Sequence, residues 1–370
     1  MVDSAALQEL KKYAGVKKLS CQLQKDKQAA LITSETNIRY LTDFANSEGT
    51  LFVTKSAAYL LVDFRYGEAA QKRVTSCEVI VFDNLAETVK DLIKKHNIEE
   101  VIIEASDVTV KRAQGLKKLF AECSCQMICD DRLDKLLSNL RIIKSPEEIA
   151  QVEKAQRITE EAYLELLNIV KVGVTEAQLA LELEFLMRKK GASGVSFDLI
   201  TIAGKKTSMP HGVPDNSVVQ NGDFVTFDIG AVYDGYHSDM TRTIAVGDVS
   251  DEQREIYSIV LEAQLAALSK VKSGVKACDV DKTAREIIEK AGYGEYFKHS
   301  TGHGVGLEIH EQPFVSPKSS TILSEGMIIT VEPGIYLPDK FGVRIEDMVA
   351  VTKDACYNFA KLPKDLVVIR

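Results

Sequence analysis

Residues 223–239 have the sequence DFVTFDIGAVYDGYHSD, and this stretch decides how the rest of the chain is interpreted. Apolar and polar side chains alternate over residues 223–228, as in a β-strand with one buried face. Asp234 and Gly235 follow as a two-residue turn signal, and the chain returns through Tyr236. The stretch therefore predicts an antiparallel hairpin.

Two aspartates of this hairpin lie on neighbouring strands. With a simple Asp-Gly turn, Gly230 lies opposite Asp239, and Asp228 lies on the diagonal. A bulge or a longer loop would instead let both carboxylates face one ion. The sequence alone leaves this register open.

Three further segments carry potential metal ligands. Glu332 follows the run of residues 327–331 and precedes a Pro-Gly turn. Arg344 and Glu346 are two residues apart, so they share one face of the last predicted strand. His303 lies between two glycines, where the missing Cβ atoms let the backbone approach a metal or a substrate closely.

Together these segments supply a set of hard donors, four carboxylates and one imidazole. The five residues are Asp228, Asp239, His303, Glu332 and Glu346. Such sites favour manganese, cobalt, zinc or magnesium over metals that prefer thiolates. Any one of these carboxylates taken singly is more typical of a solvated strand or turn. The joint pattern predicts a hydrolase with two divalent metal ions.

Histidines concentrate in the same part of the chain, because five of the six lie within residues 211–310. His211, His299 and His310 occur beside glycine and proline residues that are typical of active-site loops. His237 lies on the hairpin, and for it we expect an edge position that faces water.

An internal repeat organises these residues. Residues 161–174 (EAYLELLNIVKVGV) match residues 262–275 (EAQLAALSKVKSGV) without a gap. Both segments are predicted helices that end at a glycine. At the same offset, Gly191 and Gly292 each end a second amphipathic helix.

The repeat continues into the candidate ligands. The His-x-x-Pro motif at His211 recurs at His310, and Asp228 and Glu332 occupy equivalent positions before a glycine. Chance similarity between amphipathic helices would explain the helical part of the match, but it would not place two carboxylates in register.

We infer a duplicated α+β unit in which residues 146–247 and 248–370 are related by a pseudo-twofold axis, with the two-metal site at that axis. On superposition, the strand that carries Asp239 should match the strand that carries Glu346.

The chain resembles the pita-bread metallopeptidase family, which includes aminopeptidase P, prolidase and methionine aminopeptidase. The resemblance covers nearly the whole chain, and no metal-ligand position departs from it. Residues 37–44 and 140–148 resemble the amino-terminal domain and the domain junction of the Xaa-Pro branch. The other carriers are Asp228-Ile-Gly230, Ser238-Asp-Met-Thr-Arg-Thr243, Thr301-Gly-His-Gly-Val-Gly306, His310, Val331-Glu-Pro-Gly334 and Val343-Arg-Ile-Glu-Asp347.

The resemblance implies an α+β fold, with a smaller α/β domain followed by a pita-bread catalytic domain. It implies cleavage of Xaa-Pro peptides or dipeptides by a hydroxide that bridges two divalent ions. Manganese is the preferred ion, with cobalt or zinc as alternatives. The resemblance also implies a homodimer that acts on small peptides with proline at the second position.

The resemblance assigns roles to individual side chains. Glu332 shuttles the proton, and His211 stabilises the oxyanion. His310 and Arg344 hold the substrate beyond the scissile bond.

His299 and Tyr336 are implied to line the substrate pocket. Two simpler interpretations stay open at this point, namely that His299 caps a turn and that Arg344 pairs with Asp347.

The chain of 370 residues is long enough for two cores, since 45% of its residues are hydrophobic and 27% are charged. We expect an α/β domain over residues 1–135 and the catalytic domain over residues 136–370. Ser145-Pro-Glu-Glu148 predicts the first catalytic helix, with an N-cap, a first-turn proline and two acids. In the first domain we expect strands near 29–33, 51–54, 58–62, 78–82 and 100–103, and helices near 85–96 and 108–122.

Charge and hydropathy exclude several classes of partner. The net charge is −8 without a basic stripe, so we expect no nucleic-acid partner. Residues 1–12 lack a signal-peptide pattern, and no apolar run approaches the ~20 residues of a membrane span. The seven cysteines lack the spacing of a zinc site. We therefore expect a cytoplasmic protein with reduced thiols and no membrane partner.

Two other functions compete with an Xaa-Pro peptidase. A methionine aminopeptidase is the weaker rival, because the methionine-specific members of the family generally lack this amino-terminal domain. The second rival is a non-hydrolytic binding protein on the same fold, and such relatives lose metal ligands that this chain keeps.

Overall fold

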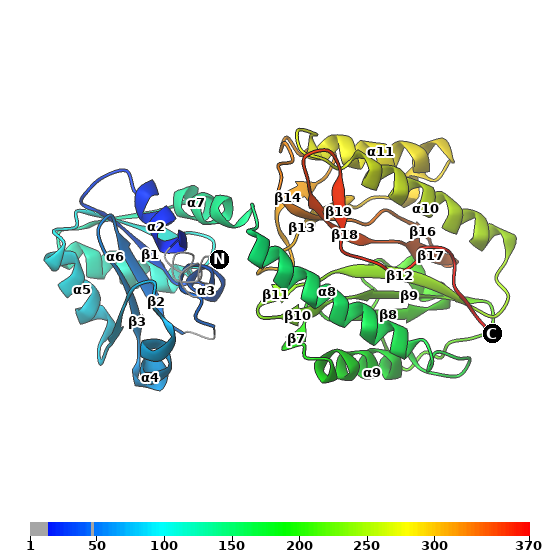
Figure 1. The fold of residues 1–370 in the computed structure, drawn as a ribbon, viewed down its shortest axis with the longest axis horizontal. Coiled ribbons are helices and arrows are strands. Elements are labelled where there is room, and N and C mark those ends of the chain that lie inside the picture. The colour runs from blue at the N-terminus through cyan, green and yellow to red at the C-terminus, as the bar shows by residue number, and fades with distance from the viewer. Residues whose placement is uncertain (1–13, 46–47) are drawn as a thin grey trace, which may run out of the picture. The chain divides into compact units, whose positions relative to one another are not determined.

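The computed structural model of the protein describes residues 14–45 and 48–370, and the chain divides into two compact units, Met1–Arg141 and Ile142–Arg370 (Figure 1). The expected domain boundary, between residues 135 and 136, falls within α7 (Asp131–Arg141), whose Leu133 and Leu137 are buried in the core of the first unit. Residues 1–12, which lack a signal-peptide pattern, lie outside the described residues.

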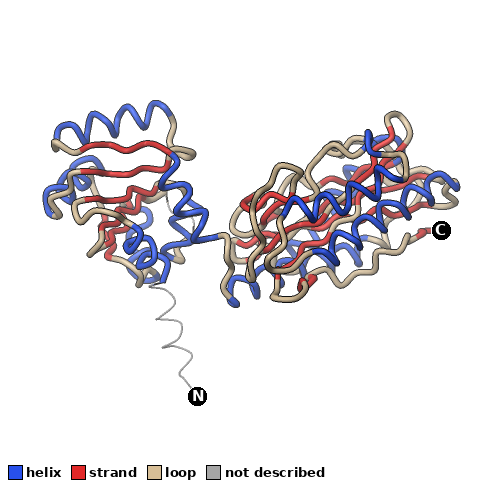
Figure 2. The backbone as a smooth tube through the Cα atoms, turned by 90° about the horizontal axis from the view of Figure 1, so that it is seen from above, coloured by secondary structure: helices blue, strands red, loops and turns tan. Residues whose placement is uncertain are grey.

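The first unit is a six-stranded mixed sheet between helices (Figure 2). Its strand order is β4-β3-β2-β1-β5-β6. The strands are β1 (Gln28–Ile32), β2 (Thr50–Thr54), β3 (Ala58–Val62), β4 (Glu78–Val81), β5 (Glu100–Glu104) and β6 (Gln126–Asp130). The helices are α2 (Ala14–Gln22), α3 (Glu35–Thr42), α4 (Phe64–Arg73), α5 (Leu85–Lys95), α6 (Val110–Glu122) and α7.

Successive side chains of β1 point to opposite faces of the sheet, and each face has its own hydrophobic core. Ala30 and Ile32 pack in a core that includes residues of α2, α3 and α7, whereas Ala29 and Leu31 pack with residues of α5 and α6. The five strands and two helices expected from the sequence are confirmed. The further elements β6, α2, α3, α4 and α7 were not predicted from the sequence.

The second unit contains two helix pairs, as the repeat predicts. They are α8 (Pro146–Leu166) with α9 (Glu176–Lys189), and α10 (Asp251–Lys270) with α11 (Ala277–Lys290). Ser145 and Glu148 form a reciprocal capping box at the start of α8, which confirms the expected helix start. The glycines that follow the four helices adopt positive φ, between 86° and 103°, in the left-handed region that favours glycine: Gly173, Gly191, Gly274 and Gly292.

The strands of the second unit lie between the two helix pairs (Figure 1). The two larger sheets have the orders β20-β12-β9-β8 and β14-β13-β15-β18-β19, and two smaller sheets have the orders β11-β10-β7 and β16-β17. The first-half strands are β7 (Gly194–Val195), β8 (Ile200–Ala203), β9 (Asp223–Ile229), β10 (Ala231–Tyr233), β11 (Tyr236–His237) and β12 (Met240–Val246). The second-half strands are β13 (Gly302–Gly304), β14 (Glu311–Val315), β15 (Ile328–Val331), β16 (Gly334–Leu337), β17 (Phe341–Arg344), β18 (Asp347–Val351), β19 (Cys356–Asn358) and β20 (Val368–Ile369).

Each half contributes its own hydrophobic core to this unit. Residues of α8, α9, β9 and β12 form one large cluster, and residues of α10, α11, β15 and β18 form the other large cluster together with Phe224 and Ala245 of the first half. A smaller third cluster includes Val152, Val305 and Met348. None of the helices in the described residues has the length and the apolar character that crossing a bilayer requires. The two cores hold rigid strand ends, and the candidate ligands lie at or next to these ends.

The first hairpin has the simple register. Ile229 pairs with Met240, and Tyr233 pairs with Tyr236 around the Asp234-Gly235 turn. Both turn residues have positive φ, 46° and 74°, as a tight hairpin turn requires. No residue is inserted, so the bulge considered from the sequence is absent.

The second hairpin turns later than the first. Val331 pairs with Asp347 and Gly334 pairs with Arg344, which places Glu332 opposite Glu346. In the first hairpin, Asp228 pairs with Thr241 instead of with a carboxylate. The two halves thus share an order of elements but not a cross-strand arrangement.

Candidate active site

One cavity of about 590 Å³ in the second unit collects every candidate site residue. The candidates among its lining residues are His211, Asp228, Asp239, His299, His303, His310, Glu332, Tyr336, Arg344 and Glu346. They come from both halves of the repeat, so neither half contains the whole set. The convergence expected from the sequence is present in the structure.

Three of these residues form the centre of the cavity. Ligand atoms of Asp239, His303 and Glu346 all lie within 4.8 Å of one another, and all three side chains are buried. Asp239 immediately precedes β12, Glu346 immediately precedes β18, and His303 lies in β13. A strand, or the position directly before one, therefore holds each of the three.

His303 presents its second ring nitrogen to the carboxylates. Its Nδ1 is 3.0 Å from the Gly304 carbonyl, so Nδ1 carries the hydrogen and donates it. Its Nε2 lies 3.5 Å from Asp239 Oδ2 and 3.4 Å from Glu332 Oε1. Burial lowers the pKa of His303 to about 4. A neutral imidazole with a free Nε2 lone pair is the form that binds metal ions.

The carboxylates of the cavity are buried close to one another, and both burial and mutual repulsion disfavour their charged forms. Burial raises the pKa of Asp239 well above its usual range, and Asp228 and Glu332 add to the rise. Burial likewise raises the pKa of Glu346, and it raises that of Glu332 to about 8. Among the described residues, Asp239 Oδ1 is buried without a hydrogen-bond partner. Hard oxygen donors with one unpaired oxygen fit divalent cations.

Asp228 reaches the cavity through a different contact. Its Oδ2 accepts a hydrogen bond of 2.6 Å from Arg344 Nη2, and the pair is nearly buried. Asp347 pairs with Arg242 on the other side of the strands. The simpler interpretation in which Arg344 pairs with Asp347 is therefore wrong, because residues an odd number of positions apart along a strand point to opposite faces.

Arg344 also begins a chain of hydrogen bonds along the cavity wall. Its Nη1 donates to the Tyr336 hydroxyl at 2.9 Å, and that hydroxyl lies 3.0 Å from His299 Nε2. His299 Nδ1 is 2.8 Å from the Ser300 carbonyl, so the Tyr336 hydroxyl donates to Nε2. Burial lowers the pKa of His299 to about 4, and Arg344 lowers it further. His299 makes a local contact, yet it also belongs to the cavity.

His211 and His310 enter the cavity from different supports. The His310 ring packs 4.4 Å from the His303 ring, measured between centroids. His211 is exposed on a loop that buried Glu176 holds at both ends. Glu176 accepts hydrogen bonds from the backbone N–H groups of Ala203 and Asp215, at 2.8 Å and 3.1 Å. A side chain from α9 thus fixes the loop that carries His211.

Two threonines support the centre and were missed in the sequence analysis. Thr241 Oγ1 donates to Glu346 at 2.6 Å, and Thr330 Oγ1 donates to Glu332 at 3.1 Å. Each threonine is two residues from a candidate ligand on the same strand, so shared strand faces could have identified both. His237 lies in the edge strand β11, as expected, but it is partly buried, and its Nδ1 has no partner among the described residues.

Comparison with known families agrees with this geometry. Residues 150–353 match the model of metallopeptidase family M24, and residues 17–143 match the creatinase/prolidase N-terminal domain. The chain belongs to metallopeptidase family M24. It is therefore a metallopeptidase, and its second unit is the pita-bread domain of that family, as the sequence predicts.

Individual relatives extend the M24 match to nearly the whole chain. An Xaa-Pro dipeptidase of Pyrococcus horikoshii is 38% identical over 342 residues, which cover 92% of this chain and 94% of the relative. The solved structure of an Xaa-Pro dipeptidase from Bacillus anthracis is 39% identical, with a TM-score of 0.90 over 98% of this chain and 100% of that one. An X-Pro aminopeptidase structure from Thermotoga maritima is 35% identical, with a TM-score of 0.86 over 92% and 97% of the two chains.

Proposed function

We propose that this M24 protein hydrolyses the bond before proline in small peptides with proline at the second position, including Xaa-Pro dipeptides. The observation that carries the proposal is the buried cluster of Asp239, His303 and Glu346 at the centre of one cavity. Similarity to Xaa-Pro dipeptidases over nearly the whole chain supports the proline preference.

Two divalent ions fit the proposed ligand set of Asp228, Asp239, His303, Glu332 and Glu346. Manganese is the proposed ion, with cobalt and zinc as alternatives, because oxygen-rich sites accept all three and availability decides among them. When bound, such ions lower the pKa of a water molecule and polarise the scissile carbonyl. The unpaired oxygen of buried Asp239 supports a cation at this position.

The remaining chemistry is proposed for side chains of the chain itself. Glu332 takes a proton and returns it to the leaving nitrogen. His211 donates a hydrogen bond to the negative charge that develops on the carbonyl oxygen. His310 and Arg344 bind the substrate beyond the scissile bond, since both can donate to a carboxylate.

His299 and Tyr336 are proposed to shape the substrate pocket. Their hydrogen bond to each other, at 3.0 Å, keeps the two rings in place beside Arg344. The X-Pro bond is a tertiary amide without an N–H, so the site has to accept a pyrrolidine ring and does not seek a hydrogen bond from that nitrogen. Apolar side chains such as Phe197 and Phe314, which line the cavity, suit such a ring.

We further propose a cytoplasmic homodimer. The family resemblance supports the dimer, and the cysteines without the spacing of a zinc site support a reducing compartment. Analytical ultracentrifugation of the purified protein checks the dimer, and fractionation of the source cells checks the compartment.

The rival functions have less support. A match to the creatinase/prolidase N-terminal domain argues against a methionine aminopeptidase. A non-hydrolytic binding protein does not need five intact ligand positions around one cavity.

The deciding experiment supplies manganese, cobalt and zinc in turn and measures hydrolysis of Gly-Pro, Ala-Pro, a longer Xaa-Pro-led peptide and a Met-Ala peptide. We expect cleavage of the Xaa-Pro substrates only with metal. The ratio between dipeptide and longer peptide then separates a dipeptidase from an aminopeptidase. Cleavage of Met-Ala without cleavage of any Xaa-Pro substrate would overturn the proposal.

A further inference from the structure

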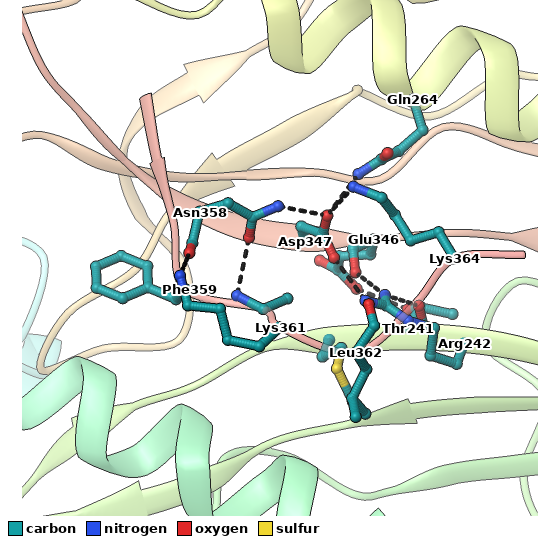
Figure 3. Close-up of polar contacts among 12 residues, drawn as sticks. Thr241, Arg242, Gln264, Glu346, Asp347, Asn358, Phe359, Lys361, Leu362 and Lys364 are labelled. Atoms are coloured by element: carbon teal, nitrogen blue, oxygen red, sulfur yellow. Dashed lines mark hydrogen bonds and ion pairs between the residues drawn. The ribbon is translucent and has the colours of Figure 1, made fainter. Parts of the chain in front are cut away.

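A buried ion pair lies directly behind the strands that carry the central ligands. It joins Arg242 in β12 to Asp347 in β18, with 2.8 Å between Arg242 Nη2 and Asp347 Oδ1 (Figure 3). The two side chains are 4% and 1% exposed, so the pair is closed to solvent. Asp347 follows Glu346 directly, and its side chain points away from the cavity.

Arg242 holds backbone as well as Asp347. Its Nη1 donates to the Glu346 carbonyl at 2.6 Å and to the Thr241 carbonyl at 2.9 Å. Its Nη2 also donates to the Leu362 carbonyl at 3.3 Å. One guanidinium therefore binds backbone carbonyls of three segments. They belong to Glu346, which is a central candidate ligand, to Thr241, which is two residues after Asp239, and to Leu362 in the carboxy-terminal segment.

Asp347 also accepts hydrogen bonds from three other side chains. Its Oδ2 accepts from Lys364 Nζ at 2.5 Å, from Asn358 Nδ2 at 2.8 Å and from Gln264 Nε2 at 3.2 Å (Figure 3). Gln264 belongs to α10 and Asn358 to β19, while Lys364 lies in the carboxy-terminal segment. Both oxygens of this buried carboxylate are thus satisfied.

The pair also joins the two halves of the repeat. β12 belongs to the first half and supplies Asp239, whereas β18 follows Glu346 of the second half. On the cavity side the same strands meet through the Thr241 hydroxyl and Glu346. The cross-strand contacts therefore set the separation of the two ligand-bearing strands from both faces.

We propose that Arg242 and Asp347, together with Lys364, are positioning residues that fix the spacing between Asp239 and Glu346 and so set the affinity for the metal pair. The ion pair itself is an inefficient source of stability, because burying two charges costs about as much as their attraction returns. The ion pair instead holds β12 and β18 at a fixed distance from each other. These strands belong to separate halves, and no short loop joins them at this point. The proposal rests on the proposed function for the identity of the ligands.

The test compares Arg242→Gln with the wild-type chain by titrating Mn²⁺ into metal-free protein in a calorimeter. Loss of such a supporting contact typically weakens metal binding about 10–100-fold, and we expect that range for at least one ion. With Co²⁺ as the probe, the visible absorption spectrum of the variant should change, because the spectrum reports ligand geometry. Excess Mn²⁺ should restore much of the turnover, which a loss of folded protein would not allow.

Arg157→Gln is the matched control. Arg157 in α8 pairs with Glu160 and donates to the Phe359 carbonyl, so it holds the same carboxy-terminal segment, and neither of these polar contacts is made to β12 or β18. We expect this variant to lose stability yet to keep wild-type Mn²⁺ affinity and Co²⁺ spectrum. Equal metal defects in both variants would mean that general stability, and not strand spacing, governs binding, and would overturn the proposal.

Lys364→Met keeps the test decisive if Arg242→Gln does not fold. Lys364 is 16% exposed and does not line the cavity, so its replacement is milder. We expect a smaller loss of Mn²⁺ affinity in the same direction. Wild-type affinity for both ions in every folded variant of the cluster would overturn the proposal. Failure of the wild-type chain to bind two ions would instead overturn the ligand set, and the positioning role with it.

Discussion

The two hairpins of the catalytic unit use different cross-strand partners. In the first, Thr241 lies opposite Asp228, and Asp239 lies on the diagonal. In the second, the pairs on either side place Glu332 directly opposite Glu346. The sequence repeat matches Asp228 with Glu332, but the later turn of the second hairpin gives the two carboxylates different neighbours.

Because of this difference, repulsion between carboxylates differs between the two halves. Carboxylates directly opposite each other repel, so the second half depends more strongly on a cation between its strands. In the first half the two aspartates do not lie opposite each other. Thr241 lies opposite Asp228, and Asp228 pairs with Arg344. A duplicated fold has thus become two unequal contributors to one site. The predictions below test that inequality, in order of the expected effect.

The largest effect is expected at Asp239, the first half's contribution to the three-residue centre. Asp239→Asn removes a ligand charge with little change in volume, so metal content should fall and peptidase activity should become undetectable while the chain stays folded. Elemental analysis and circular dichroism measure the two properties. Asp234→Asn, at the exposed turn of the same hairpin, is the control and should behave as wild type. Two metals per chain and normal turnover in Asp239→Asn would exclude Asp239 as a ligand.

His211→Ala should lower kcat by about 10²–10³-fold, because its proposed hydrogen bond forms only when charge develops in the transition state. Metal content should not change. The counterpart His310→Ala should in addition weaken metal binding, since the His310 ring packs on His303. Steady-state kinetics and metal analysis of both variants separate the two effects. Collapse of metal binding in His211→Ala would make His211 a ligand or a structural residue.

The site was largely predictable because its chemistry is local in sequence. Ligands such as His303 and Glu332 lie in short motifs whose glycines and strand alternation can be seen directly in the printed chain. The helix start at Ser145 was predictable for the same reason, since a capping box spans only four residues. Such local patterns identify a helix or a strand and the face of that helix or strand on which a side chain lies.

Partners that lie far apart in the chain were not predictable in the same way. Arg344 has several acids nearby in sequence, yet it pairs with Asp228, 116 positions away. The neighbour Asp347 is taken by Arg242, 105 positions away. Such pairings depend on how the two halves dock, which no alternation within one strand reports.

A moderate effect is expected at Thr241, where the first half offers a hydroxyl instead of a carboxylate. Thr241→Val keeps the shape but removes the donor to Glu346 and the acceptor for Arg344. Mn²⁺ affinity should fall about tenfold, at the low end for supporting contacts. Thr226→Val is the matched control, because Thr226 bonds only to the Thr243 hydroxyl at 3.1 Å among the contacts described. It should cost about 1 kcal/mol of stability and leave metal binding unchanged. Equal Mn²⁺ affinities in the two variants would argue against a role for Thr241.

The smallest effect concerns the pH dependence of stability in the metal-free protein, and it arises in the second half. Burial lowers the pKa of His299 to about 4 from the 6.5 of an unperturbed histidine. Above pH 6.5 both folded and unfolded chains carry a neutral ring, so His299 contributes no pH dependence. Between pH 6.5 and 4 only the unfolded chain takes up the proton, so the free energy of unfolding should fall as pH falls. Below pH 4 both states are protonated and this fall ends.

His299→Gln isolates that contribution, because glutamine carries no charge at any of these pH values. Urea unfolding of metal-free wild type and variant is measured at intervals from pH 7 to pH 4, and the wild type should lose more free energy of unfolding over this range than the variant. The difference between the two curves is the test, because burial also lowers the pKa of His303 to about 4 and raises that of Glu332 to about 8, and these two contributions have opposite signs. Identical slopes would mean that the His299 ring is protonated as readily in the folded chain as in the unfolded one. In that case its Nε2 could not be the acceptor of the Tyr336 hydroxyl, and the hydrogen-bond chain from Arg344 would have to run in another direction.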